Sequence, residues 1–396
     1  MSFFRLLAWS LITTAIVIAA IGGAGYWLYL DAERDGPLAE ARTLVVPPHR
    51  GVMAIGGLLE NKGVIRHRLA FVLVAKLSGR SHSLKPGEYE IPAWASAMQT
   101  LDILATGRTV KHRLTIPEGL TSAEVVTLVK KAPALDGDPG AVPPEGALLP
   151  DTYVYSYGDQ RHELIERMRH SMAHTVAQLW HERRADLPLA TPQEAVTLAS
   201  IVEKETAREE ERPHVAGVFI NRLRLGMRLQ ADPTVLFALG DNGASKIDRP
   251  LTHADLAVAS PYNTYLVREL PPGPIDNPGK ASLRAAMRPE ATDDLYFVAD
   301  GSGGHVFAKT LAEQSHNIAL YRHSAGPEPD PLPPLAPLAA PALQPQHSAA
   351  AETLAPPPAK PAKQASAAAH HHAKRVRPQA AKLARCRSAT AHGCSR

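Results

Sequence analysis

The first pattern along the chain is an uncharged apolar run that is long enough to cross a membrane. Residues 6–30 contain no charged side chain, and about 20 such residues span a hydrocarbon layer of about 30 Å. Trp9 lies near one end and Trp27 near the other, as is typical of the two membrane–water interfaces. The pattern predicts one transmembrane helix after a cytoplasmic stub at residues 1–5, with the body exported. A cleaved signal peptide is the alternative because small residues occur at 22–25, but the apolar run continues past them and favours a retained anchor.

A short polar connector is expected over residues 31–45, followed by a small α+β module over residues 46–112. Residues 54–79 have the amphipathic spacing of helices, and LKPGEYEIP combines a Pro-Gly turn with the alternation of a strand. SAMQTLDILATG then has the pattern of a helix that ends at Gly107.

A second unit is expected over residues 113–322. It opens with a strand at RLTIP, a helix capped at Thr121 or Ser122, and an aromatic strand at LLPDTYVYSYG. Helical patterns follow at about 160–185 and 191–211, and we expect Pro213 to end the second. The remaining expected elements are a helix at HVAGVFINRLRLG, a helix at DPTVLFALG, a β-hairpin at LYFVADGSGGHVFAKT and a closing helix at LAEQSHNIALYR.

From residue 323 to 396 the pattern gives way to proline and alanine. This composition cannot build a core, so we predict a disordered tail. From Ala325 onward there are nine Lys/Arg and three Asp/Glu, a net charge of +6, so the formal +4 of the whole chain leaves −2 for residues 1–324. The basic balance therefore belongs to the tail, and the body gives no argument for nucleic acid as a partner. A basic tail could lie against anionic wall polymers or lipid head groups, and solvated disorder without a partner is the alternative.

The two cysteines, Cys386 and Cys394, both lie in this tail. The body can therefore hold neither a disulfide nor a cysteine-based zinc site. Whether the two cysteines pair with each other stays open. The three histidines at 370–372 are interpreted as an incidental low-complexity run rather than a metal site.

The main chemical question comes from TPQEAVTLASIVEKETAREEER, which places Glu203 and Glu205 at the end of an apolar helical run. At about 100° per residue both lie at the edges of the apolar face, on opposite sides of it. Their neighbours differ, because a helical residue lies against positions i−3 and i−4. Glu205 lies against Val202 and Ile201, which disfavour the charged carboxyl and raise its pKa, as a general acid near neutral pH requires.

Glu203 lies against a serine and an alanine and is expected to have the more polar, more easily solvated site. Lys204 is nearly opposite the apolar face and is expected to face solvent. The structural alternative is that both glutamates end the helix in ion pairs with Arg208 or Arg212, and composition alone favours that interpretation.

Several longer motifs shift the balance towards chemistry. They are ASIVEKETA with a following ER, VFINRLRLGMRLQADPTV, YNTYLVRELPPGPIDNPGKASLRAA and LYFVADGSGGHVF. Together they resemble the YceG-like family, the MltG-type endolytic murein transglycosylases, over about residues 45–322. Members of that family are single-pass inner-membrane proteins with the catalytic domain outside, in agreement with an anchor at 6–30 and a body on the periplasmic side.

The resemblance implies an α+β fold class. The expected parts are an N-terminal transmembrane helix, a small LysM-like α+β module at 46–112, a mainly helical lysozyme-like catalytic domain with a β-hairpin at 113–322, and the disordered Pro/Ala-rich basic tail at 323–396. It also implies peptidoglycan glycan strands and the membrane as partners, and the cell-wall synthesis machinery as a further candidate.

The reaction implied by the resemblance is cleavage of the β-1,4 bond between N-acetylmuramic acid and N-acetylglucosamine inside a glycan strand. The family's catalytic glutamate is the second one of E-K-E, which is Glu205. Ordinary glycosidases need two carboxylates. A lytic transglycosylase needs one, because the muramoyl 6-hydroxyl attacks C1 of its own sugar with a high effective molarity and leaves a 1,6-anhydro end. Neither a metal nor a cofactor is expected.

Six polar residues of the matched motifs are expected to bind substrate through amide, phenol or carboxyl groups: Asn221, Gln230, Asp232, Tyr262, Asn263 and Tyr265. Each also has a structural interpretation. Asn221 suits a helix surface, Gln230 a strand edge and the tyrosines packing, and Asp232 is more simply the cap of the following helix.

Two other functions stay open. One is a non-catalytic scaffold in which the LysM-like module binds the wall. The other is a muramidase-type hydrolase in which Asp232 positions water. The mass of the released product separates the two enzymes, because an anhydro end is lighter than a hydrolysed end by one water.

Overall fold

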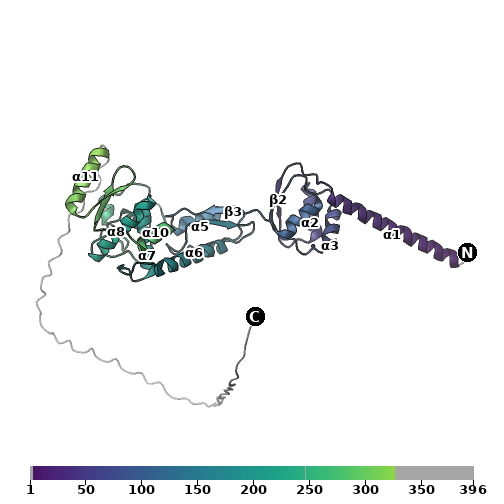
Figure 1. Ribbon diagram of the computed structural model, residues 1–396, viewed down its shortest axis with the longest axis horizontal. Helices are drawn as coiled ribbons and strands as arrows, with labels where there is room; N and C mark the ends of the chain where they lie inside the picture. Colours follow the sequence, from purple (N-terminus) through teal and green to yellow (C-terminus); the bar gives the residue numbers. More distant parts are fainter. Residues whose placement is uncertain (1–2, 246, 326–396) are drawn as a thin grey trace, which may run out of the picture. The chain divides into compact units, whose positions relative to one another are not determined.

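The computed structural model describes residues 3–245 and 247–325, and Figure 1 shows their arrangement along the chain. Its first helix, α1 (Phe3–Glu33), has a mean hydropathy of 2.0 and is exposed along its apolar window, so among the described helices it is the one long and apolar enough to span a membrane. The predicted anchor helix is confirmed as an element.

The module after α1 is a two-stranded antiparallel sheet with three helices. Its elements are β1 (Arg42–Val46), α2 (Val52–Asn61), α3 (Arg68–Leu77), β2 (Gly87–Ile91) and α4 (Ala97–Thr106). In the sheet Leu44 pairs with Tyr89, whose ring is completely buried. Helix α4 begins with a reciprocal capping box at Ser96 and ends at Gly107, whose φ of 72° suits a residue without a Cβ. The predicted helix and its glycine end are confirmed.

The stretch expected to be a polar connector is partly packed. Asp31, Ala32 and Leu38 are buried, and Ala32 and Leu38 belong to the module's hydrophobic core. Asp31 Oδ2 also contacts His67 Nδ1 at 2.9 Å. The connector prediction over 31–45 was therefore too simple, because a run that is polar on average still contains the few apolar residues that the core takes up.

A second core lies around a short antiparallel pair. Its elements are β3 (His112–Thr115), α5 (Ser122–Lys131), β4 (Thr152–Tyr155) and the first half of α6 (Arg161–His181). Helix α5 begins with a capping box at Thr121, which resolves the choice between Thr121 and Ser122. The unit expected over 113–322 thus contains two hydrophobic cores, of which this is the first.

The larger core is helical. Helix α7 (Pro192–Glu205) packs on α8 (Arg212–Arg224) and α10 (Lys280–Met287), with α9 (Asp232–Leu239) beside it, and Figure 1 shows α7, α8 and α10 together. All positions of α7 from Ala195 to Val202 are buried. A helix buried on nearly every side can present polar groups only at its ends, and both acidic residues in question lie at its C-terminal end.

Two predicted helix boundaries are wrong. Helix α7 ends at Glu205, not near residue 211, because Thr206 is extended (φ −138°, ψ 132°) and its hydroxyl bonds Glu211 at 3.1 Å. A 3-10 turn, Glu209–Glu211, follows. Pro213 does not end a helix but lies in the first turn of α8, where its missing N–H costs nothing.

The last described elements are the predicted hairpin and closing helix. Strands β5 (Tyr296–Ala299) and β6 (His305–Ala308) pair antiparallel, and α11 (Leu311–Ala325) contacts both. The hairpin and helix predictions are confirmed. Apart from residues 323–325, which end α11, the predicted tail lies outside the described residues, as do both cysteines and the histidine run.

Candidate active site

Glu205 is the last residue of α7, at the point where the chain leaves the helical core. The extended backbone at Thr206 ends the helix there, and the Arg208 N–H donates to the Thr206 hydroxyl at 3.1 Å. Aliphatic packing holds the preceding turns in place, since Ile201 and Val202 are both fully buried. The carboxyl is therefore carried by a rigid element at the edge of the core.

The Glu205 carboxyl keeps its proton at neutral pH. It is half-buried, and it forms no hydrogen bond or ion pair with any residue of the described chain. Burial raises its pKa to about 8, the negative charge of Asp232 adds to the rise, and the Arg222 guanidinium opposes it. The raised pKa expected from the aliphatic neighbours is confirmed, and the contribution of Asp232 is new.

Asp232 and Tyr265 form a hydrogen-bonded pair beside Glu205. The Tyr265 hydroxyl donates to Asp232 Oδ1 at 2.5 Å, and burial together with the charge of Asp232 raises the pKa of that phenol. Asp232 is exposed and is the first residue of α9, whose N-cap is Ala231 without a side-chain cap bond. The interpretation of Asp232 as a helix cap is therefore wrong; its carboxylate accepts from a phenol of another loop instead.

Hydrogen bonds from Thr264 to residues 230–234 hold Tyr265 beside Asp232. Thr264 is fully buried. Its hydroxyl accepts a hydrogen bond from the Ala231 N–H and lies 2.9 Å from the Thr234 hydroxyl. Its carbonyl accepts from the Gln230 N–H at 3.2 Å. Gln230 has a φ of 52°, a left-handed conformation that costs a non-glycine residue energy. Its side chain makes no hydrogen bond with the described residues. Such strain is typical of functional loops. Gln230 also lies two residues before Asp232, so both observations favour a functional role for this loop.

The other two residues of the YNTY motif have structural partners. Asn263 is fully buried; its amide donates to the Leu256 and Val258 carbonyls at 2.9 Å each, and its oxygen accepts from the Tyr265 N–H at 2.9 Å. The Tyr262 ring packs on Phe237 with 4.9 Å between the ring centroids. Asn263 thus shapes the loop that presents Tyr265, whereas Tyr262 is only partly buried and keeps part of its surface accessible.

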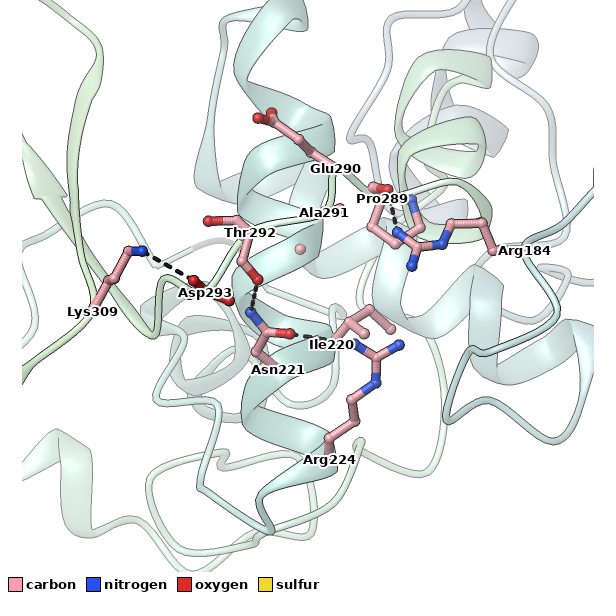
Figure 2. A pocket seen from close by; sticks show the side chains of 11 residues that line it. Arg184, Ile220, Asn221, Arg224, Pro289, Glu290, Ala291, Thr292, Asp293 and Lys309 are labelled. Carbon is pink, nitrogen blue, oxygen red and sulfur yellow. Dashed lines mark hydrogen bonds and ion pairs between the residues drawn. The ribbon is translucent and has the colours of Figure 1, made fainter.

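Asn221 lies in a different pocket from Glu205. Its amide donates to the Thr292 carbonyl at 2.7 Å and the Asp294 carbonyl at 3.1 Å. Figure 2 shows this pocket, in which the Asn221 side chain points towards Thr292 and the cations Arg184, Arg224 and Lys309 surround it. Arg184 and Arg224 each bond Asp186, and Lys309 bonds Asp293. The three cations of this pocket are therefore already paired, two with Asp186 and one with Asp293 of the 289–293 loop.

Glu203, the first glutamate of E-K-E, is tied into a structural network. Its side chain is 4% exposed and contacts the Arg212 guanidinium at 2.8 Å, which also contacts Glu118 at 3.1 Å. The Gly279 N–H donates to its other oxygen at 2.9 Å. Our expectation of a more solvated site for Glu203 is wrong, while the Arg212 ion pair that we weighed as an alternative exists. Arg212 and Gly279, which are distant in the sequence, bury this carboxyl, so the pattern of α7 alone could not predict its burial.

The sequence analysis missed two buried ionic groups near α7. Arg222 is 7% exposed; its guanidinium donates to the Leu295 and Leu229 carbonyls, and burial lowers its pKa. Asp276 is fully buried, neither carboxyl oxygen has a hydrogen-bond partner in the described structure, and burial holds its pKa well above the ordinary value. A search for ionisable residues directly before the NPG turn would have found Asp276, although not its burial.

The arrangement supplies proton-transfer groups and no metal ligand cluster. His170 and His174 are one turn apart on α6, yet no three His, Cys, Asp or Glu side chains in the described ranges come close enough to hold a metal ion. The groups available for chemistry are therefore the protonated Glu205 carboxyl and the nearby Asp232 carboxylate, which the Tyr265 hydroxyl orients.

Comparisons with known proteins identify the family of this chain. The YceG-like family profile matches residues 44–320. The endolytic murein transglycosylase of Bacillus subtilis is 31% identical over 337 residues, covering 76% of this chain and 91% of its own length. The enzyme of the same name from Streptococcus pneumoniae is 29% identical over 354 residues, covering 78% of this chain and 64% of its own. A crystal structure of a YceG-like protein from Listeria monocytogenes is 31% identical and covers 70% of this chain and 98% of its own, with a TM-score of 0.45. The profile spans well over half of the residues, so the chain belongs to the YceG-like family.

Proposed function

We propose that this protein is a membrane-anchored endolytic murein transglycosylase. It cleaves the β-1,4 bond between N-acetylmuramic acid and N-acetylglucosamine inside peptidoglycan glycan strands. The observation that carries the proposal is Glu205 at the end of α7. Its carboxyl has no hydrogen-bond or ion-pair partner among the described residues, and burial raises its pKa to about 8. Two relatives named endolytic murein transglycosylase support the same reaction.

Glu205 acts first as an acid and then as a base. The carboxyl donates its proton to the glycosidic oxygen as the bond from that oxygen to C1 of the muramoyl sugar breaks. The resulting carboxylate accepts the proton of the muramoyl 6-hydroxyl as O6 bonds C1. The products are a free 4-hydroxyl on one fragment and a 1,6-anhydro end on the other, no water is consumed, and the carboxyl is protonated again.

Asp232 has an electrostatic role in this proposal. Its negative charge adds to burial in raising the pKa of Glu205, which keeps the acid protonated before the reaction. The same charge favours the positive charge that develops at C1 in an oxocarbenium-like transition state. The Tyr265 hydroxyl, bonded to Asp232 at 2.5 Å, fixes the orientation of that carboxylate.

The remaining predicted binding residues divide into two groups. Gln230 and Tyr262 have polar atoms left for the N-acetyl and hydroxyl groups of the sugars, and we assign them to direct contact. Asn263 holds the Tyr265 loop and Asn221 holds the 289–294 loop, so we assign both to shaping the cleft rather than touching sugar.

We extend the proposal to the membrane helix, the N-terminal module and the helical domain. Helix α1 anchors the protein in the cell's inner membrane with the body in the periplasm. The β1-α2-α3-β2 unit is a LysM-like module that binds glycan, and the helices around α7 form a lysozyme-like catalytic domain. Components of the cell-wall synthesis machinery are the expected protein partners.

The decisive experiment is mass analysis of the products. Purified glycan strands are digested with the full-length protein in detergent, and the new ends are analysed by mass spectrometry. We expect fragments ending in 1,6-anhydro-muramic acid, and the Glu205→Gln variant serves as the inactive control. Ends that are heavier by one water would reject the transglycosylase assignment, and no cleavage by the wild type would favour a wall-binding scaffold.

A muramidase-type hydrolase is the second candidate, and one observation favours it. Hydrolases need a second carboxylate to position water or to attack C1, and Asp232 is a carboxylate close enough to Glu205 to raise its pKa. The same mass measurement separates the two enzymes.

A further inference from the structure

A mainly apolar groove begins beside the proposed active site. Its volume is about 860 Å³, and one wall comes from the β3–α5 loop and α5, the other from α9. Lys204 and Pro233 line it, and they directly adjoin Glu205 and Asp232 in the chain. One end of the groove therefore lies near the backbone of the two residues that carry the carboxyls.

The walls do not suit a sugar. Their side chains are mostly aliphatic, namely Pro117, Leu120, Leu128, Leu236 and Ile275, with Phe237 as the one aromatic ring among the described lining residues. Sugars need many hydrogen-bonding partners or flat aromatic faces, whereas small apolar groups such as alanine methyls gain from aliphatic walls. The volume lies within the range of about 300–1,000 Å³ that holds a ligand of a few residues.

One cation stands in the groove. The Lys204 ammonium donates to the Gly119 carbonyl at 2.9 Å, and no carboxylate of the described chain lies within ion-pair distance of it. The positive charge of Lys204 opposes the rise in the pKa of the buried Asp276. Neither carboxyl oxygen of Asp276 has a hydrogen-bond partner among the described residues. Glu124 is the one lining acid, and it caps α5 by bonding the Thr121 N–H at 2.9 Å. The ammonium therefore has donors left for an anionic ligand.

We propose that this groove binds the peptide stem of the muramoyl residue at the cleavage site, with Lys204 holding one of its carboxylates. The inference rests on the proposed function. The stem is a short peptide with alanine methyls and free carboxylates, attached to the lactyl group of the sugar that would sit beside Glu205. Aliphatic walls, an ammonium without a carboxylate partner among the described residues, and the proximity of Lys204 and Pro233 to Glu205 and Asp232 in the chain together match that chemistry.

The test compares two substrates for each variant. Full-length protein in detergent is assayed on glycan strands that carry their stems and on strands whose stems an amidase has removed. We expect Lys204→Met and Leu236→Gln each to lower the ratio of kcat/KM for stem-bearing over stem-free strands by about tenfold, as loss of a charge-assisted contact or of wall packing does. The matched controls, Lys130→Met on α5 and Leu239→Gln on α9, lie outside the groove and should leave the ratio as in the wild type.

The outcomes separate this inference from the proposed function. If the wild type cleaves neither substrate, the function fails. If cleavage occurs but the ratio is unchanged in both groove variants, or both rates fall together, the stem site is rejected. A second substrate pair, strands with and without their polyprenyl anchor, tests a lipid occupant. A fall in the preference for anchored strands, with no change in the stem ratio, would reject the peptide in favour of a lipid. Thermal unfolding of each variant shows whether its fold is retained.

Discussion

At the scale of single residues, the protonation of Glu205 decides the chemistry. A carboxyl with a pKa near 8 donates a proton at neutral pH, and two causes produce that value: burial at the end of α7 and the charge of Asp232. We therefore expect kcat/KM to fall as pH rises through about 8, because the acid form is lost there. A pH–rate profile on glycan strands measures this. An alkaline limb near the ordinary glutamate value of about 4.3 would contradict the assignment.

The same profile tests Asp232. Replacing it with asparagine removes the negative charge that raises the Glu205 pKa, so the alkaline limb of Asp232→Asn should move to lower pH. Tyr265→Phe is the matched control, because it removes the phenol but leaves the Asp232 charge in place. An unchanged limb in Asp232→Asn, alongside a lower rate, would mean that Asp232 acts only on substrate.

Glu205→Gln should abolish cleavage and also stabilise the fold above acidic pH. The amide cannot donate and recover a proton, so we expect a loss of about 100-fold or more. Below the unfolded pKa the carboxyl is protonated in both states, and the variant gains nothing. Between there and about pH 8 the unfolded carboxyl ionises and the folded one does not, which costs the wild type stability. The variant should therefore have a higher Tm at pH 8 but the same Tm at pH 4, and equal values at both would contradict the raised pKa.

At the scale of elements, Arg212 joins α8 to α7 and to the loop before α5. Replacing it with methionine leaves Glu203 buried and unpaired, which should cost about 3 kcal/mol in the free energy of unfolding. Glu203→Gln should be milder, because the neutral amide still accepts from Gly279. Urea unfolding of both variants, and of the double variant, checks this. A double variant less stable than Arg212→Met would contradict the ion pair.

Glu203 also shows why two similar glutamates differ. Both lie at the C-terminal end of one helix, yet one is closed in by an arginine and a glycine N–H while the other has no internal partner among the described residues. We expect Glu203→Gln to keep most of its cleavage activity in the glycan digestion that inactivates Glu205→Gln.

At the scale of the whole molecule, the described body ends with α11. Gln314 of that helix donates to the Phe297 carbonyl of β5 at 2.9 Å, so the helix belongs to the folded part. Deleting residues 326–396 should leave glycan cleavage by the rest of the chain within about twofold of the wild type, because a Pro/Ala-rich composition does not build a cleft. Turnover on short strands measures this, and a loss of tenfold or more would show that the tail contributes to the site.

The reaction as a whole should not depend on a metal. A protonated carboxyl and an internal hydroxyl nucleophile suffice for it. We expect EDTA to leave the cleavage rate unchanged and added zinc not to raise it, with a metal-dependent glycosidase or amidase as the positive control. A rate that falls with EDTA and returns with one metal ion would overturn the single-carboxyl mechanism.

Local patterns alone determined much of this protein. The apolar run of α1, the helix end at Gly107, the cap beside Thr121 and the hairpin near residue 300 depend on neighbours within a few positions, so the sequence predicts them. It also predicts a raised pKa for Glu205, because its i−3 and i−4 neighbours are aliphatic. The helix end at Glu205 was missed, because a Thr206–Glu211 contact decides it.

Only the tertiary structure decided which polar groups meet. Asp232 and Tyr265 are 33 residues apart, Glu203 and Gly279 are 76 apart, and Asn221 turned out to hold a loop in another pocket. A side chain's role depends on the charge and solvent around it, and segments distant in the sequence supply both. That is why the sequence could single out Glu205 as the candidate acid, while the groove, the carboxylate beside Glu205 and the burial of Glu203 depended on the fold.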